Sequence, residues 1–279
     1  MNDWNIGIST GCFYQISIFD CLEDIRNAGF CTIEISSSPS HLDYHNKEAV
    51  KQAKAKMAEL GIEPYSFHAP FGADIDITSL DEKVRDNSYQ ELLNAADAAV
   101  LIGVRYLVIH PGPEKPHNPS DQDHMQRLEN AGKVLNKVAS FCKDHKIDLV
   151  LENVLPHLIF GNMRDMLWIL GSINTTNVGT CMDTGHAALS GDIDIITYKI
   201  SGYLRYIHAH DNKGKYDDHL PPGSGTIDWH KLLLSLTRTA FRGSIILELA
   251  GNQQRRNDEV LSDARQSRLF LRNLSKLQT

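Results

Sequence analysis

Short apolar segments alternate with longer amphipathic segments along most of this chain. The short segments are apolar at nearly every position, so they indicate strands that are buried on both faces. Strands of this kind favour a parallel sheet that is covered by helices. The predicted strands are Asn5–Thr10, Cys31–Ser36, Ile62–His68, Val104–His110, Ile147–Glu152, Asn177–Asp183, Tyr203–His210 and Ser244–Leu249.

The longer segments carry their apolar residues at helical spacing. Three of them end at a glycine, Gly29, Gly61 or Gly103, and glycine is a common residue at a helix end. Each predicted helix follows one of the predicted strands. The predicted helices are Ile18–Ala28, Lys47–Leu60, Asp81–Ile102, Asp121–His145, Met163–Ile173, Ile193–Ser201, Asp228–Ala240 and Asp258–Leu274.

Eight strand–helix units predict the α/β fold class and a single (β/α)8 TIM barrel. The chain has 279 residues, which suits a barrel of this kind, typically about 250 residues long. We see no linker, low-complexity segment or change in composition that would mark a boundary. We therefore expect residues 1–279 to form one domain.

The predicted strand ends carry the candidate chemistry, because active sites of such barrels lie where strands pass into the following loops. In the stretch Cys181-Met182-Asp183-Thr184-Gly185-His186, we expect a strand to end in a loop, with glycine permitting a tight turn. Asp183 and His186 would then form a pair of metal ligands. Other strand ends and one loop supply similar residues: His68, His110, Glu152, His208, His210, Glu248, Asp217 and His219.

Each of these residues alone could be a packed core histidine or an ion-paired acid. Together they are better explained by a divalent metal ion, because buried carboxylates need charged partners and the basic residues lie mostly on helices. We interpret the remaining histidines as surface or structural residues, and Cys181 as barrel packing. Those histidines are His41, His45, His117, His124, His145, His157 and His230.

The formal net charge of −7 gives no support for general binding to nucleic acid or to a membrane surface. Five cysteines without CxxC spacing, and the lack of a leader or of a long apolar run, predict a reducing, cytoplasmic setting.

The order of the strand-end residues resembles the xylose isomerase-like TIM-barrel superfamily along nearly the whole chain. This superfamily includes sugar isomerases, ketose 3-epimerases and the endonuclease IV enzymes. In the sugar enzymes, four positions hold one divalent ion, and they match Glu152, Asp183, His208 and Glu248. The resemblance implies proton transfer through a metal-stabilised enediolate, with Glu152 and Glu248 as the catalytic acid–base pair.

The substrate-binding residues predicted beside this centre are His186, His210 and Lys213. Two positions depart from the ketose 3-epimerases. Gly214 stands where an arginine is usual, and Leu158 stands where a second glutamate is usual. Simple ketose 3-epimerisation is therefore not the expected reaction.

The resemblance to endonuclease IV adds further metal ligands. In that three-zinc pattern, His68, His110, Asp217 and His219 join the first four residues. One difference argues against a DNA substrate. Residues 153–156 are Asn-Val-Leu-Pro, whereas the endonuclease IV family has a glycine-rich stretch there. No basic loop interleaved with aromatic residues is present to grip a kinked duplex.

We therefore expect a divalent-metal-dependent isomerase or epimerase that acts on a small sugar, sugar phosphate or inosose-like substrate. The ion would be Zn²⁺, Mn²⁺, Co²⁺ or Mg²⁺, with more than one ion per chain possible and zinc favoured at the histidine-rich positions. A multi-zinc phosphodiesterase is the alternative function. A barrel that binds metal or sugar without turnover is a second alternative.

Overall fold

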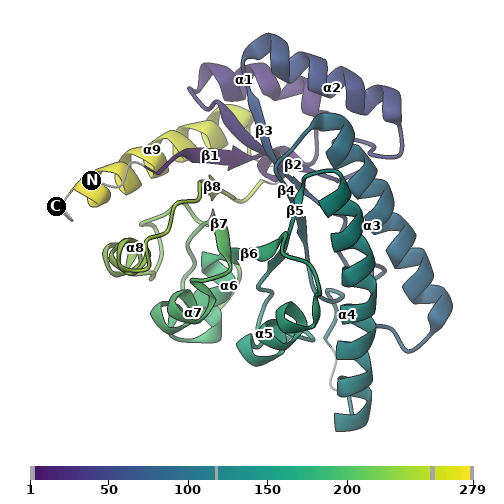
Figure 1. Cartoon of the computed structure of the whole chain (residues 1–279). Helices are drawn as coiled ribbons and strands as arrows, with labels where there is room; N and C mark the ends of the chain where they lie inside the picture. The colour runs from purple at the N-terminus through teal and green to yellow at the C-terminus, as the bar shows by residue number, and fades with distance from the viewer. Residues whose placement is uncertain (1–3, 117–118, 252–254, 277–279) are drawn as a thin grey trace.

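The strands form one closed parallel barrel in the order β1 to β8, and β8 pairs with β1. The computed structural model describes residues 4–116, 119–251 and 255–276 (Figure 1). This arrangement confirms the predicted TIM barrel. The strands are β1 Ile6–Ser9, β2 Thr32–Ser36, β3 Glu63–His68, β4 Tyr106–Ile109, β5 Asp148–Glu152, β6 Val178–Asp183, β7 Leu204–Ala209 and β8 Ile245–Leu247.

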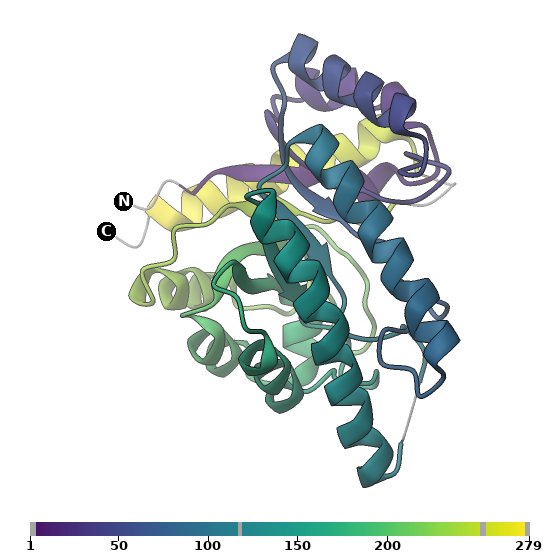
Figure 2. The ribbon, with the colours of Figure 1, turned by 45° about the vertical axis from the view of Figure 1, so that its right-hand side comes forward.

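Helices surround the barrel, and the long helices α3 and α4 lie side by side along it in both ribbon views (Figures 1 and 2). In the described ranges, none of the helices is long and apolar enough to cross a bilayer. The helices are η1 Thr10–Phe13, η2 Ile18–Asp20, α1 Leu22–Asn27, α2 Lys47–Leu60, α3 Glu82–Ile102, α4 Asp121–Asp144, α5 Met163–Ser172, α6 Thr184–Ser190, α7 Ile193–Ile200, α8 Trp229–Arg238 and α9 Asn257–Lys276.

Apolar side chains fill two regions, one between the strands and the helices and one inside the barrel. The first is the larger and includes Ile33, Leu107 and Leu149, which are fully buried. Cys181 belongs to the second, as its predicted packing role requires. The interior cluster consists of Tyr65, Tyr106, Val108, Val150, Cys181, Tyr206 and Ile246.

Local capping explains where several helices begin and end. The side chain of Asn46 accepts hydrogen bonds from the backbone N–H groups of Glu48 and Ala49, which satisfies two donors at the start of α2. Gly61 and Gly103 follow α2 and α3 with φ of 64° and 88°, a conformation that glycine adopts without strain. Both predicted helix ends are therefore confirmed.

Two predicted elements differ from the structure. The predicted helix Ile18–Ala28 is divided into η2 and α1. The loop predicted after Asp183 is instead helix α6, which begins at the next residue. Asp183 is the N-cap of α6, because its Oδ1 accepts a hydrogen bond from the His186 N–H at 2.7 Å. The strand therefore passes directly into a helix.

Candidate metal centre

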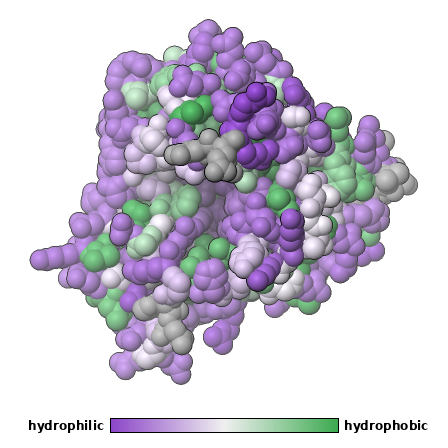
Figure 3. Space-filling model, turned by 180° about the vertical axis from the view of Figure 1, so that it is seen from behind, coloured by the Kyte–Doolittle hydropathy of each residue, from purple (hydrophilic) through white to green (hydrophobic). Residues whose placement is uncertain are grey.

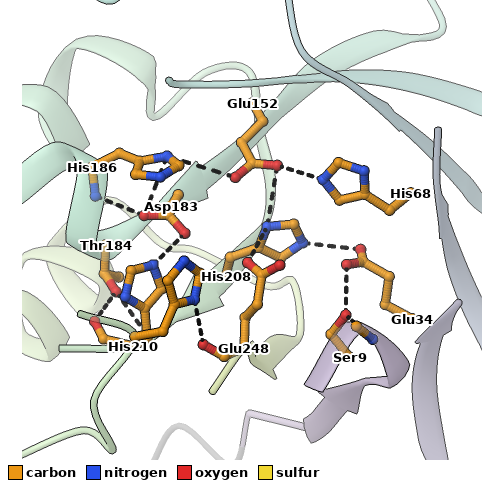
Figure 4. Close-up of polar contacts among 12 residues, drawn as sticks. Ser9, Glu34, His68, Glu152, Asp183, Thr184, His186, His208, His210 and Glu248 are labelled. Carbon is orange, nitrogen blue, oxygen red and sulfur yellow. Dashed lines mark hydrogen bonds and ion pairs between the residues drawn. The ribbon is translucent and has the colours of Figure 1, made fainter. Parts of the chain in front are cut away.

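The carboxyl ends of β5, β6, β7 and β8 bring four predicted ligands together (Figure 4). Glu152 and Asp183 end their strands, His208 lies within β7, and Glu248 directly follows β8. One ligand atom from each of these four residues lies within 4.8 Å of the other three. We name this set the core group.

The core group leaves one buried nitrogen without a hydrogen bond. His208 Nδ1 lies 3.3 Å from Glu152 Oε2 and 3.2 Å from Glu248 Oε2, yet it makes no hydrogen bond of normal geometry. A buried polar atom in that state costs free energy unless something else satisfies it. Three carboxylates and an imidazole are donors that suit Zn²⁺, Mn²⁺, Co²⁺ or Mg²⁺, so the core group fits a divalent ion.

Two more predicted ligands approach Glu152 from β3 and from the end of β4. His68 Nε2 lies 3.1 Å from Glu152 Oε2, and His110 Nε2 lies 3.4 Å from the same atom. Both ring nitrogens of His110 are buried without a hydrogen bond of normal geometry, although Nδ1 lies 3.1 Å from Glu114 Oε1. His68, Glu152 and His208 form a second group, in which one ligand atom of each residue lies within 4.8 Å of those of the other two.

A third group consists of His186, His210, Asp217 and His219. Asp217 Oδ2 lies 3.2 Å from His186 Nε2 and 3.1 Å from His219 Nε2, and Asp217 Oδ1 is buried without a hydrogen bond. All nine candidate ligands that the sequence predicted lie together at one end of the barrel in the structure. That they bind metal remains a prediction.

The negative charges of the carboxylates in this cluster are balanced by imidazoles. Burial by itself would raise the pKa of Glu152, but the imidazoles of His208 and His110 together outweigh it and hold that pKa well below its usual range. Burial would lower the pKa of His110 and His219, but carboxylates raise each to about 9, Glu152 beside His110 and Asp217 beside His219. The imidazoles thus carry the positive charge that a bound divalent ion would supply.

The sequence suggested that Gly185 permits a tight turn, and that interpretation was wrong. Gly185 is needed instead because the neighbouring His210 ring leaves no room for a side chain. Gly185 lies in α6, and a Cβ atom there would be 2.1 Å from His210 Cε1. His210 Nε2 lies 2.7 Å from Asp183 Oδ2, and the His210 ring stacks on His219 with centroids 3.8 Å apart. The glycine therefore makes room for the imidazole that holds Asp183.

The three predicted substrate-binding residues lie in different surroundings. His186 lines a cavity beside the core group. His210 is fully buried behind Asp183. Lys213 is exposed, and its backbone N–H donates to Asp218 Oδ2 at 2.9 Å. Contact with substrate therefore has structural support at His186, and the roles of His210 and Lys213 remain predictions.

The sequence interpretation missed Glu34 of β2, which is fully buried beside His208. Glu34 Oε2 lies 2.9 Å from His208 Nε2 and accepts hydrogen bonds from Ser66 Oγ and Tyr206 OH, each at 2.8 Å. A glutamate between isoleucines in a strand that is buried on both faces was the available signal, because such a carboxylate must have partners inside the barrel.

The other histidines mostly have structural contacts. His41 Nδ1 lies 2.6 Å from the Ile16 carbonyl, and His124 Nε2 lies 2.9 Å from Asp165 Oδ2. His145 Nδ1 lies 2.9 Å from the Phe141 carbonyl. His157 departs from this pattern because it lines a cavity at the candidate centre. His117 lies outside the described residues.

Two cavities of about 360 Å³ each open at this end of the barrel. Both are lined by His68, Phe71 and Glu248, so they meet at the core group. Figure 3 shows a hollowed face on which hydrophilic residues predominate. The first cavity is otherwise lined by Ser9, Gly11, Tyr14, Ser36, Ser37, Ser38, Pro39 and Pro70. The second is otherwise lined by His110, Glu114, Pro116, Glu152, Leu155, His157, Leu158, His186, Asp217 and His219.

The chain belongs to the xylose isomerase-like TIM barrel family, whose model matches residues 22–274. An uncharacterised protein of Methanocaldococcus jannaschii is 28% identical over an alignment of 254 residues, and the match covers 88% of this chain and 84% of that protein. A probable endonuclease 4 of Mycobacterium ulcerans is 28% identical over an alignment of 219 residues, and the match covers 75% of this chain and 79% of that protein.

Solved structures share the same fold. A D-tagatose 3-epimerase-like protein superposes with a TM-score of 0.85 at 24% identity, and the match covers 98% of both chains. The IOLI protein, whose structure holds a zinc atom, superposes with a TM-score of 0.83 at 17% identity, and the match covers 99% of both chains.

Replacing Gly185 by alanine tests the packing behind Asp183. We expect Gly185→Ala to displace the His210 ring, disturb the Asp183 carboxylate and weaken zinc affinity, measured by competition with a chromogenic chelator. Gly171→Ala in α5 is the matched control, because its Cβ would meet nothing within 4 Å. There we expect unchanged affinity and equal or slightly higher stability, since alanine favours a helix by up to about 1 kcal/mol. Equal zinc affinity in both variants would contradict this role of Gly185.

Proposed function

We propose that this protein is a divalent-metal-dependent isomerase or epimerase that acts on a small, sugar-like hydroxy-ketone. The observation that carries the proposal is the convergence of Glu152 and Glu248 from separate strands on one position beside His208. Two carboxylates next to one ion position are what proton removal and return at a carbon atom require.

Within the core group, Asp183 and His208 are fully buried and would hold the ion with the two glutamates. When bound, a divalent ion would polarise a carbonyl and a neighbouring hydroxyl, which would acidify the C–H bond of the carbon that bears the hydroxyl. Glu248 faces both cavities and Glu152 faces the second. One glutamate would take the proton from the substrate carbon, and the other would deliver a proton to it.

The cavity walls favour a neutral, hydroxyl-bearing substrate over a sugar phosphate. The first cavity is lined by four serines, of which Ser9 contacts Glu34, and by the aromatic residues Tyr14 and Phe71. No lysine or arginine lines either cavity among the described residues. A phosphate group is usually held by such cations or by a helix N-terminus, and the serines are better suited to hydrogen-bonding sugar hydroxyls.

The fold-level likeness to a D-tagatose 3-epimerase-like protein supports a sugar reaction. Two positions argue for a reaction other than ketose 3-epimerisation. Leu158 lies in the wall of the second cavity, so an apolar side chain stands at the position where those enzymes have a glutamate. Gly214 supplies no cation where they have an arginine.

An endonuclease IV-like phosphodiesterase is the second candidate. The observation that favours it is the third group, in which Asp217 is surrounded by histidines. Its Oδ1 atom is buried and makes no hydrogen bond. A second ion there would satisfy that oxygen, and clustered ions suit phosphodiester cleavage. The absence of cations from the described cavity walls argues against a DNA backbone as the ligand.

Removing single ligands tests which residues hold the core ion. We expect Glu248→Ala to lower the affinity for zinc or manganese by more than about 100-fold. Removing a residue that only hydrogen-bonds a metal ligand already lowers metal affinity about 10- to 100-fold, and Glu248 would contact the ion itself. His110→Ala is the control at the edge of the site, and it should keep the core ion while lowering activity. Metal content and affinity of both purified variants give the answer. If His110→Ala loses all metal, the cluster binds its ions as one unit and the phosphodiesterase gains support.

A deuterium-exchange assay separates the candidate functions. The manganese-loaded protein should exchange solvent deuterium into a ketose, an inosose or a related hydroxy-ketone, detected by mass spectrometry. It should act far more slowly on the matching sugar phosphate, and it should leave a duplex with an abasic site intact. Chelator-sensitive cleavage of that duplex would replace the proposed function by the second candidate. Metal-dependent sugar binding without exchange would indicate the non-catalytic barrel.

A further inference from the structure

Glu34 places a fully buried carboxylate inside the barrel, beside the core group (Figure 4). Oε2 accepts from Ser66 and Tyr206, while Oε1 lies 3.3 Å from Ser9 Oγ. Ser9 Oγ also accepts the Gly11 N–H at 3.2 Å, which leaves its own hydrogen free for Glu34. Both carboxylate oxygens thus face hydrogen-bond donors.

Oε2 of Glu34 already accepts two hydroxyl hydrogens, so the geometry makes it the acceptor toward His208 as well, and the hydrogen between Glu34 and His208 belongs to the imidazole. Glu34 Oε2 lies 2.9 Å from His208 Nε2, which therefore carries that hydrogen. In a neutral imidazole, the other nitrogen then has a free lone pair. That nitrogen is Nδ1, which points between Glu152 and Glu248 without a hydrogen bond.

We propose that Glu34 is a positioning residue that fixes His208 with its hydrogen on Nε2 and its Nδ1 lone pair toward the divalent ion. A carboxylate behind a metal-binding histidine sets the tautomer, orients the ring and raises the basicity of the coordinating nitrogen. The inference rests on the proposed metal centre, and it does not depend on the sugar reaction.

A merely structural role for Glu34 makes a different prediction. If the carboxylate only satisfied buried hydroxyl groups, the hydrogen bonds from Ser66 and Tyr206 would matter as much as the one from His208. The positioning role requires the His208 contact alone to govern metal affinity. Variants that remove one donor at a time therefore distinguish the two roles.

The test compares Glu34→Gln with Ser66→Ala, using the full-length protein without substrate. The amide of Glu34→Gln is close in size to the carboxylate, but its NH₂ group can donate to His208 Nε2 and so favour the wrong tautomer. We expect zinc affinity, measured by chelator competition, to fall about 10- to 100-fold in Glu34→Gln. Ser66→Ala removes another donor from the same oxygen and should keep wild-type affinity. Wild-type affinity in Glu34→Gln, or an equal loss in both variants, would overturn the proposal.

Nitrogen NMR of the zinc-loaded wild-type protein provides a second measurement that needs no variant to fold. The His208 ring should show a hydrogen on Nε2 and zinc on Nδ1. Zinc on Nε2, or a hydrogen on Nδ1, would contradict the role of Glu34. If these measurements succeed while deuterium exchange fails for every hydroxy-ketone, the positioning role stands and only the proposed reaction falls.

Discussion

The constraint on which this site depends is that buried carboxylates inside the barrel have no lysine or arginine partner among the described residues. Glu152 is the centre of that problem, because three imidazoles from β3, β7 and the end of β4 converge on its Oε2 atom. Buried charge must be compensated, and imidazoles do so only by holding protons. A divalent ion in the core group would compensate the same charge and would also satisfy His208 Nδ1, which lacks a hydrogen bond.

The barrel makes this convergence possible, because parallel strands bring residues that are far apart in sequence to a single rim. His68 and Glu248 are separated by most of the chain, yet both line the same two cavities. Beneath the rim, Glu34 links His208 to Tyr206 and so joins the core group to the packed interior of the barrel. Two candidate ligands are thus held in place by buried polar contacts, His208 by Glu34 and Asp183 by His210.

Much of this could be predicted from the sequence, since apolar strands and glycine-ended helices are local patterns and strand ends of a barrel share one rim. Other features depend on contacts that no local pattern encodes. Helix α6 begins at once because Asp183 caps it, and Gly185 is small because His210 packs there. Glu34 has partners on three other strands or their ends, Ser9, Ser66 and His208, so its environment becomes evident only when the barrel closes.

Anomalous diffraction at the zinc absorption edge, from crystals of the zinc-loaded protein, tests the central claim most directly. The account predicts the strongest peak among Glu152, Asp183, His208 and Glu248, with the Nδ1 atom of His208 and the carboxylate oxygens about 2.0–2.2 Å from the ion. Zinc bound only away from these four residues, or a core group that stays free of metal at saturating zinc, would contradict it.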